Sequence, residues 1–260
     1  MKKSLRIWYL YNIMSFERTL SNRFISVVFI ISKLLRMFIF FGFLLLIFSK
    51  ASDISGFSRE QIIFFYLSYN LIDTAAQFLF RNVYLFQATV VSGDLDYVLL
   101  KPLNPLIRVL LGGADVLDLI MLILIICITM YFGITQISGD LLFWIGYWVL
   151  VANSLFIAAS LHIFVLSIGV ITVSIDHLVM IYRDITALMR IPVDLYSAPL
   201  RAVLTVVIPL GVMFTFPPKF LMRLLSFDTL LYSIFLSAVL FFCSINFWKH
   251  SLRHYRSASG

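Results

Sequence analysis

The sequence has few charged residues and almost no cysteine. Only 13% of its 260 residues are Asp, Glu, Lys or Arg, whereas 62% are apolar. Soluble domains average roughly 25% charged and 45–50% apolar residues, so this composition argues against a soluble fold. The two cysteines, Cys127 and Cys243, both lie inside apolar runs, which argues against a disulfide framework and against a CxxC metal site. We therefore expect lipid to be the main solvent of the chain.

The sequence also lacks the motifs of common catalytic sites. Its four histidines show no HExxH spacing, and it contains neither a GxSxG nucleophile motif nor a GxxxxGK[ST] phosphate loop. We therefore predict no catalytic residue, no metal site and no cofactor bound by this chain. Any use of a nucleotide is expected to take place on another protein.

What the sequence does contain is a series of long apolar runs. Blocks of about 20 apolar residues separated by short charged stretches are typical of transmembrane helices, and the alternation typical of a β-barrel is not seen. The sequence predicts an all-α polytopic membrane protein that forms a single domain over residues 1–260 and has about six transmembrane helices. Five of the expected spans are clear: 25–48, 60–82, 106–133, 141–171 and 229–248.

The remaining segments are less apolar. Residues 3–22 place apolar side chains at helical spacing and predict an amphipathic helix at the membrane surface. Residues 87–104 are too rich in Pro and Gly for a span and predict an ordered intracellular loop. Residues 172–191 contain charges and 192–218 contain five prolines, so each is an imperfect span. Residues 172–223 are either a fifth span followed by a segment that does not cross, or an inner amphipathic helix followed by a span.

The distribution of Lys and Arg predicts the orientation of the chain. Positive residues are more frequent in short cytoplasmic loops than in outer ones. Placing the N-terminus inside puts most of the basic residues near the predicted span ends, and the basic tail after residue 248, in the cytoplasm. The net charge of +7 is then explained by contact with membrane lipid and requires no nucleic acid. Both termini are predicted to be cytoplasmic.

Charged and polar residues inside the predicted spans are the candidate functional residues. Each charge at the centre of a span costs about 2.5–3.5 kcal/mol on insertion scales unless it meets a partner or a water-filled cavity. The second span carries a polar stripe along one face, and the third span carries Arg108 with two carboxylates that could pair with the stripe. The candidates for a translocation path or for polar contacts between helices are Asn70, Asp73, Gln77, Arg81, Asp115, Asp118, Asp176, His177, Arg183 and Asp184.

These residues allow more than one function. They could line a translocation route, or they could make static polar contacts between helices. As a set they favour a transporter over a membrane scaffold or sensor that anchors a partner, because a scaffold needs no polar route. A membrane-embedded enzyme acting on lipid is the third alternative, and Asp176, His177 and Asp184 are its only candidate cluster.

Two segments resemble a known family. Residues 92–106 read SGDLDYVLLKPLNPL, and residues 190–218 read RIPVDLYSAPLRAVLTVVIPLGVMFTFPP. The first resembles the inner loop of the permeases of the bacterial ABC type-2 family. The second resembles the family's proline-marked segment after the fifth span. With the surface helix at the start, the resemblance covers nearly the whole chain.

The resemblance implies a permease subunit of an ATP-driven exporter in the bacterial inner membrane. It implies six spans, with 172–191 as the fifth and 192–223 as a re-entrant segment at the outer surface. The permease would pair with itself or a sister permease and with a cytoplasmic ABC ATPase dimer that binds ATP and Mg. The loop 87–104 would be a coupling helix that contacts the ATPase. The residues that would sit in or beside a cleft of the ATPase are Gly93, Asp94, Leu95, Asp96, Lys101, Pro102 and Asn104.

Overall fold

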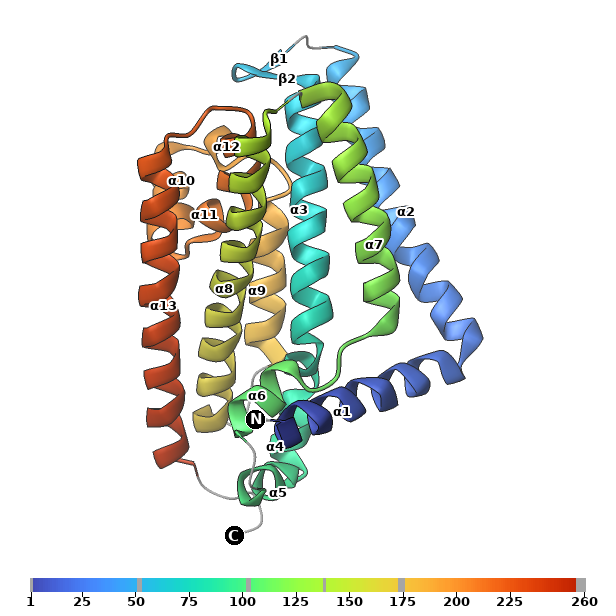
Figure 1. Cartoon of the computed structure of the whole chain (residues 1–260), viewed down its shortest axis with the longest axis vertical. Coiled ribbons are helices and arrows are strands. Elements are labelled where there is room, and N and C mark those ends of the chain that lie inside the picture. Colours follow the sequence, from blue (N-terminus) through green and yellow to red (C-terminus); the bar gives the residue numbers. More distant parts are fainter. Residues whose placement is uncertain (1, 51–52, 102–103, 138, 173–175, 256–260) are drawn as a thin grey trace.

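The computed structural model describes residues 2–50, 53–101, 104–137, 139–172 and 176–255. Over these residues the protein is helical, apart from a short antiparallel hairpin of β1 (Asp53–Ile54) and β2 (Phe57–Ser58). The predicted all-α membrane fold is confirmed (Figure 1). Among the described residues, five helical segments are long and apolar enough to cross a membrane: Arg23–Phe48, Arg59–Val91, Val116–Ile137, Leu141–Thr172 and Phe227–Arg253.

The long helices run lengthwise between the two ends of the bundle (Figure 1). They are α2 (Arg23–Phe48), α3 (Arg59–Phe80), α7 (Val116–Phe132), α8 (Leu141–Thr172) and α13 (Phe227–Arg253). The short π-helical turn η2 (Gly133–Ile137) extends α7. These bounds lie close to the predicted spans, except at the start of α7.

Capping side chains explain where two of these helices begin. Before α3, the Ser58 hydroxyl accepts a hydrogen bond from the backbone N–H of Gln61 (3.3 Å), and the Gln61 side chain accepts one from the Ser58 N–H (2.9 Å). Before α7, the Asp115 carboxylate accepts a hydrogen bond from the N–H of Leu117 (2.9 Å). Caps of this kind satisfy N–H groups that the helix itself leaves unpaired.

The predicted third span, 106–133, is divided into two helices. A short helix, α6 (Pro105–Leu111), precedes α7, and Gly112 to Asp115 separate them. Gly113 has a φ of +138°, which favours glycine. At Gly112 a Cβ would lie 2.3 Å from the carbonyl oxygen of Arg108. The predicted start of this span was therefore wrong because the glycine pair breaks the helix before the membrane-spanning part begins.

The predicted fifth span, 172–191, is not among the five long apolar helices. Helix α9 (Asp176–Leu188) has 13 residues, fewer than the roughly 20 needed to cross the hydrocarbon core. Its last turn is followed by Pro192, which precedes the short helix η3 (Val193–Leu195). Since α8 ends near the lower end of the bundle and α13 begins at the upper end, the chain returns upward between them, and α9 makes part of that path (Figure 1).

Residues 192–223 form short helices grouped near the end of the bundle that carries the β-hairpin (Figure 1). Helix α10 (Ala198–Ala202) continues into the π-helical turn η4 (Val203–Val207), and α11 (Leu210–Phe214) is followed by α12 (Phe216–Leu221). Most of the side chains of α11 and α12 are buried. Of the two alternatives left open by the sequence, a segment that does not cross fits these short helices better than a single span does.

The opposite end carries the N-terminal helix and the predicted intracellular loop. Helix α1 (Lys2–Ser21) lies across the direction of the long helices (Figure 1), as expected for a helix at a membrane surface. The buried Asn12 side chain fixes it by accepting a hydrogen bond from the N–H of Ala114 (2.8 Å). The predicted loop, 87–104, contains most of α4 (Phe86–Val91) and all of α5 (Asp94–Leu100), and it is preceded by η1 (Arg81–Leu85) and followed by α6.

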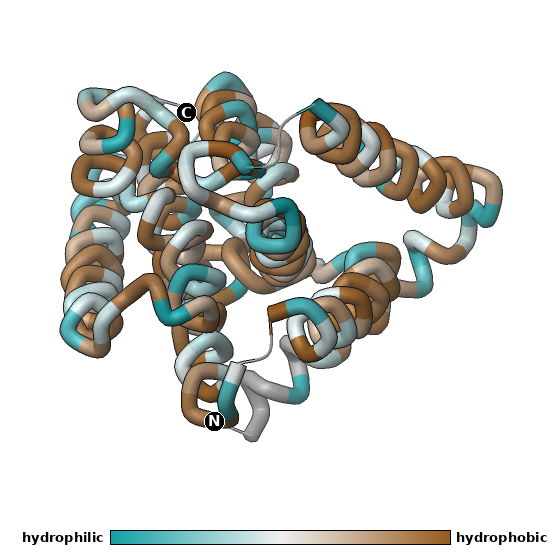
Figure 2. The backbone as a smooth tube through the Cα atoms, turned by 90° about the horizontal axis from the view of Figure 1, so that it is seen from above, coloured by the Kyte–Doolittle hydropathy of each residue, from teal (hydrophilic) through white to brown (hydrophobic). Residues whose placement is uncertain are grey.

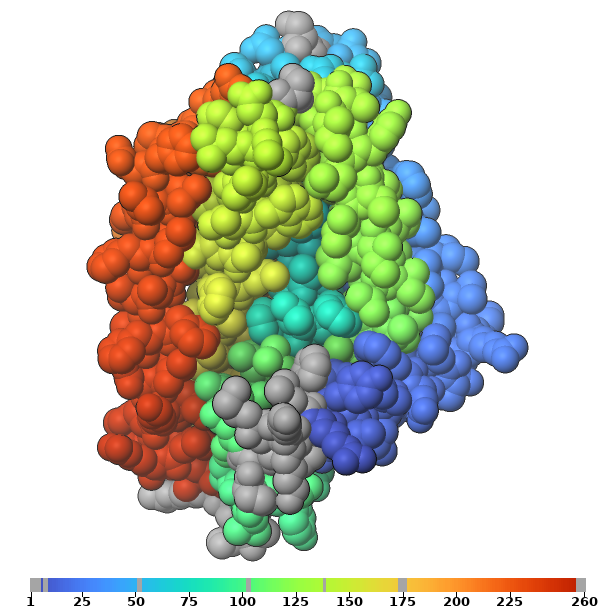
Figure 3. Space-filling view, viewed as in Figure 1, coloured from blue at the N-terminus to red at the C-terminus, as the bar shows by residue number. Residues whose placement is uncertain are grey.

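Helices α3 and α8 form the centre of the bundle. Nearly all side chains of α3 from Ile62 to Ala76 are buried, and α13 packs along the length of α8 (Figure 3). Apolar residues cover most sides of the helices (Figure 2). In contrast α2 lies at the edge, and only Ser26 and Leu44 of its residues are buried. The edge position leaves much of the apolar surface of α2 for contact with lipid.

The close approach of α8 to α12 gives a test of this packing. A Cβ at Gly146 would lie 2.1 Å from the ring of Phe220, which is fully buried. We expect Gly146→Ala to lower the unfolding free energy by about 1–3 kcal/mol through overpacking. The measurement is unfolding of the purified protein in mixed micelles. Gly42→Ala on α2 is the matched control, because a Cβ there has no atom within 4 Å; an equal loss in both variants would contradict the packing.

Candidate functional site

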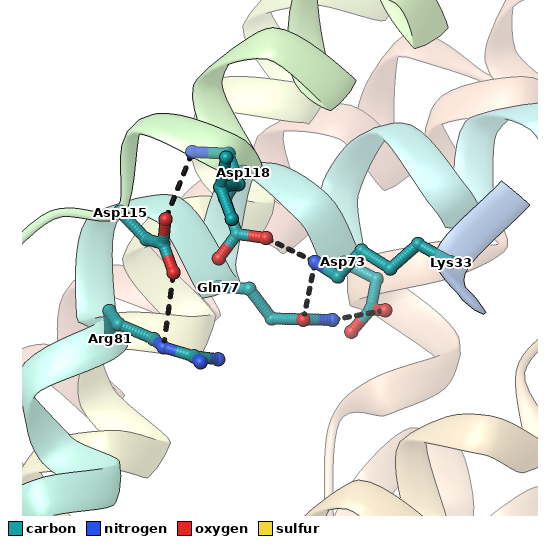
Figure 4. A network of polar contacts seen from close by, with 7 residues as sticks. Lys33, Asp73, Gln77, Arg81, Asp115 and Asp118 are labelled. Atoms are coloured by element: carbon teal, nitrogen blue, oxygen red, sulfur yellow. Dashed lines mark hydrogen bonds and ion pairs between the residues drawn. The ribbon is translucent and has the colours of Figure 1, made fainter. Parts of the chain in front are cut away.

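The polar stripe predicted on the second span lies on α3 and faces α2 and α7. Gln77 donates a hydrogen bond from its amide to the Asp73 carboxylate (2.7 Å). Asn70 donates one to the carbonyl oxygen of Tyr66 (2.7 Å). Gln77 meets Lys33 and Arg81 meets Asp115, which come from two other parts of the bundle, and Asp73 joins them through Gln77 (Figure 4). The stripe is thus part of a network that joins three helices.

Lys33 of α2 makes the central contact of this network. Its ammonium forms an ion pair with the Asp118 carboxylate of α7 and donates a hydrogen bond to the Gln77 side-chain oxygen (3.1 Å). The Lys33 side chain is 11% exposed and that of Asp118 is 0% exposed. Figure 4 shows Lys33 reaching from α2 to both partners. A buried carboxylate and a buried ammonium neutralise each other here, as charges inside a membrane require.

A second ion pair joins α7 to the C-terminal end of α3. The Arg81 guanidinium lies 3.7 Å from the Asp115 carboxylate, as expected for a pairing between the stripe and Asp115. Asp118 instead pairs with Lys33 of α2, which the sequence analysis did not consider. Arg108 does not share a helix with Asp115, because the glycine break separates them. It lies instead over the ring of Tyr11, 4.8 Å from the ring centre.

The charges predicted on the fifth span lie on α9 beside a cavity of about 210 Å³. Arg183 and Asp184 line this cavity together with Asp73 and Gln77 of α3. His177 is exposed and does not line the cavity, and the side chain of Asp176 lies outside the described residues. In the described part of the chain, no group of three or more His, Cys, Asp or Glu residues could hold a metal ion. The structure thus brings two of these four residues to the polar stripe.

The sequence analysis missed the cations of the first span. Lys33 and Arg36 lie inside an otherwise apolar run, and both line cavities next to Asp73. Arg190, which follows α9, lines the same two cavities. The argument that identified the stripe on α3 applies to these residues too, because a charge inside a transmembrane helix is costly unless it meets a partner or water.

The predicted coupling loop forms a helical tip at the end of the bundle that carries α1. Gly93 has a φ of +77° and ends α4, since its N–H donates to the carbonyl oxygen of Val90 (3.2 Å). The left-handed backbone favours glycine and lets α5 start in a new direction. Asp94 and Asp96 lie in the first turn of α5, where negative charge is favoured by the helix dipole.

The two faces of α5 differ in exposure. Leu95 and Val98 are buried in the protein, whereas Tyr97 is 67% and Leu100 is 81% exposed. Figure 1 shows α5 at the extreme lower end of the molecule. Leu95 therefore anchors the helix in this conformation, and the exposed face includes Asp94, Tyr97 and Leu100.

The other residues of the predicted coupling loop follow α5. Lys101 is exposed directly after the helix. Asn104 is also exposed and caps α6, because its side-chain oxygen accepts a hydrogen bond from the N–H of Leu106 (3.0 Å). Pro102 lies outside the described residues. Pro105 begins α6.

The described chain ends near the same tip, at Tyr255. Tyr255, which follows α13, is part of the residues packed on the core. Burial and then the Asp96 carboxylate raise the pKa of the Tyr255 phenol. A tyrosine that stays neutral beside a carboxylate links the position of α5 to the end of α13.

The buried Lys33–Asp118 pair gives a test of the network. Removing one buried partner leaves the other charge uncompensated and costs about 3–5 kcal/mol, whereas removing both costs less. We expect Asp118→Leu and Lys33→Met each to destabilise the protein, and the double variant to recover part of the loss. A double-mutant cycle on unfolding in mixed micelles measures the coupling.

The ion pair between Arg223 and Asp140 is the matched control for this cycle. Its two side chains are 55% and 70% exposed, and exposed pairs contribute about 0–1 kcal/mol. Arg223→Met with Asp140→Leu should therefore show almost no coupling. Equal coupling at the two pairs would contradict the assigned role of the Lys33–Asp118 pair.

Comparison with known proteins agrees with this geometry. Residues 34–259 match the family model described as ABC-2 family transporter protein. The chain matches no curated protein and no solved structure. The family match includes the polar network from Asp73 to Asp118 and the tip formed by α5. Because it also covers nearly the whole chain, the protein belongs to the ABC-2 transporter family of membrane permeases.

Proposed function

We propose that this protein is the transmembrane permease subunit of an ATP-driven exporter. It pairs with itself or with a sister permease, and a separate cytoplasmic ABC ATPase dimer binds ATP and Mg and drives transport. Membership of the ABC-2 family supports the role in transport. The proposal that the permease couples to an ATPase rests on one observation, which is that α5 presents an exposed face at the tip of the molecule.

The composition of the α5 tip suits contact with a protein. Tyr97 and Leu100 present apolar surface next to Asp94, and aromatic anchors are enriched at protein interfaces. The buried Leu95 and Val98 hold α5 against the bundle, so a push on the tip is transmitted to the protein. This arrangement matches the predicted coupling helix better than a free loop.

The orientation proposed from the sequence places this tip in the cytoplasm of a bacterial cell. Helix α1, the end of α13 and α5 all lie at one end of the bundle (Figure 1). Arg18, Lys101 and Arg253 lie at or near this end, as the preference for positive charge on the cytoplasmic side requires. Both termini are then cytoplasmic, and 192–223 lies at the outer surface of the cell membrane.

The polar network provides a place where helices can change position. Helix α2 has little buried surface, and Lys33 ties it to α7 and α3. In the proposed cycle, ATP closes the ATPase pair, the ATPases push on α5, and α2 shifts relative to α3 and α7. The residues around Asp73 would then be exposed to the opposite side of the membrane.

The alternatives to an exporter receive less support. A static scaffold needs no cations beside a polar cavity inside the membrane, and the family match favours transport. An enzyme acting on lipid would require its acid and base groups to converge. His177 and Asp184 are both exposed, and His177 does not line the cavity that Asp184 lines.

Removing the exposed face of α5 tests the coupling. We expect Asp94→Arg combined with Tyr97→Ala to reduce the amount of ATPase that co-purifies with the tagged permease by about tenfold or more, since central interface residues often contribute at least 2 kcal/mol. ATP hydrolysis by the purified complex should fall in parallel. The permease itself should keep its thermal stability, because both side chains are exposed.

Asp228→Arg combined with Tyr232→Ala is the matched control. Asp228 also lies in the first turn of a helix, Tyr232 is 49% exposed, and both lie toward the opposite end of the bundle. This variant should retain the ATPase. A wild-type permease that purifies without any ATPase in mild detergent would overturn the exporter proposal.

A further inference from the structure

The cavity beside α9 is lined by more cations than its neighbours neutralise. Arg36 of α2, Arg183 of α9 and Arg190 surround a space of about 210 Å³ next to Asp73. Lys33 lines the adjoining smaller cavity, which shares Arg36, Asp73 and Arg190 with the larger one. The charges of Lys33, Arg36 and Arg183 all act on the Asp73 carboxylate.

The pairing of these cations is incomplete. Lys33 is paired with Asp118. Among the described residues, no carboxylate lies within ion-pair distance of Arg36, Arg183 or Arg190. Arg183 lies over the ring of Tyr84 (5.8 Å) and Arg190 over that of Phe40 (5.4 Å), so both guanidinium groups face aromatic rings.

The position of the cavity makes this excess of positive charge costly. Lys33 lies about 15 Å along α2 from Arg23, at 1.5 Å per residue, which is near the middle of a hydrocarbon core of about 30 Å. Arg36 and Arg183 are both exposed in the single chain. A cation at this depth requires an opposite charge or water, and Asp73 and Asp184 are too few for three guanidinium groups.

The chemistry of the cavity fits an anion. Guanidinium groups bind phosphate and carboxylate through paired hydrogen bonds, and Thr186 and Tyr69 add hydroxyl groups to the lining. Met180 and Ala187 line the same space and could contact an apolar chain. The space exceeds the roughly 30 Å³ that one water occupies several times over.

We propose that this cavity binds the phosphate or carboxylate group of an anionic molecule, held by Arg183, Arg190 and Arg36. The identification of this anion as the exported cargo rests on the proposed function, whereas the binding itself does not. An anionic amphiphile fits the site, because its headgroup would neutralise the arginines while its apolar part follows the helices into the lipid.

Native mass spectrometry of the purified full chain tests the site. The probes are phosphatidylglycerol, which is anionic, and phosphatidylcholine, which carries no net charge. We expect the wild type to retain phosphatidylglycerol in preference to phosphatidylcholine. Arg183→Gln and Arg190→Gln should each weaken phosphatidylglycerol binding about tenfold, as expected when a charged hydrogen bond is lost. Arg183→Lys should give a smaller loss, because it keeps the charge but not the fork of donors.

Arg201→Gln is the matched control, since Arg201 is exposed on α10 and does not line the cavity. It should bind phosphatidylglycerol as the wild type does. Inorganic phosphate identifies the source of the anion: displacement of the lipid by phosphate supports a site for free anions, and no displacement supports a site for a lipid headgroup. Binding that is equal in the wild type and the arginine variants would overturn the proposal.

Two further outcomes separate this proposal from others. If Arg183→Gln or Arg190→Gln abolishes self-association of the permease but leaves phosphatidylglycerol binding unchanged, the anion-site proposal is overturned and the arginines belong to a contact between subunits. Loss of phosphatidylglycerol without loss of the co-purifying ATPase would support the anion site independently of the α5 tip. The anion site and the exporter proposal can therefore fail separately.

Discussion

Neutralisation of charge inside an apolar bundle is the constraint on which this structure depends. Asp118 is fully buried, and its partner Lys33 comes from a helix that buries almost nothing else. Without that ion pair, α2 would be held mainly by apolar contacts that lipid can replace. The Lys33–Asp118 pair therefore adds a specific contact to the apolar packing that positions α2 relative to α3 and α7.

The same constraint gives the two sides of α3 different roles. The side toward α8 is packed with apolar and small residues, as in a rigid core. The side toward α2 and α9 carries Asp73 and Gln77 and borders polar cavities. A helix that is rigid on one side and hydrated on the other is suited to remain in place while its neighbours move, as the proposed transport cycle requires.

Much of this organisation could be predicted from the sequence, because intramembrane charges and long apolar runs are local signals. The approximate bounds of α2, α3, α8 and α13 and a pairing of the stripe with Asp115 were predicted, whereas the pairing of Asp118 with Lys33 was not. The break at Gly112 and Gly113 was not, because a glycine pair in an apolar run does not show whether the helix continues.

The cations around the cavity illustrate a different limit of prediction from the sequence. Lys33 and Arg36 were overlooked because a single basic residue does not interrupt the hydropathy of a span, and only the tertiary structure shows that they meet Asp73 beside Arg190. Conversely, the coupling segment was predicted from a resemblance alone, and the structure adds which of its side chains are available: Tyr97 and Leu100 are exposed, whereas Leu95 is buried.

Site-specific photo-crosslinking in the native membrane is the most direct test of the central claim, which is that α5 delivers ATPase motion to the bundle. A benzophenone amino acid would replace Leu100, which is 81% exposed, and in a control Leu231 of α13, which is 63% exposed. The account predicts that position 100 crosslinks to an ABC ATPase and that position 231 does not. Crosslinks from position 100 that reach only lipid, or a protein without ATPase activity, would contradict it.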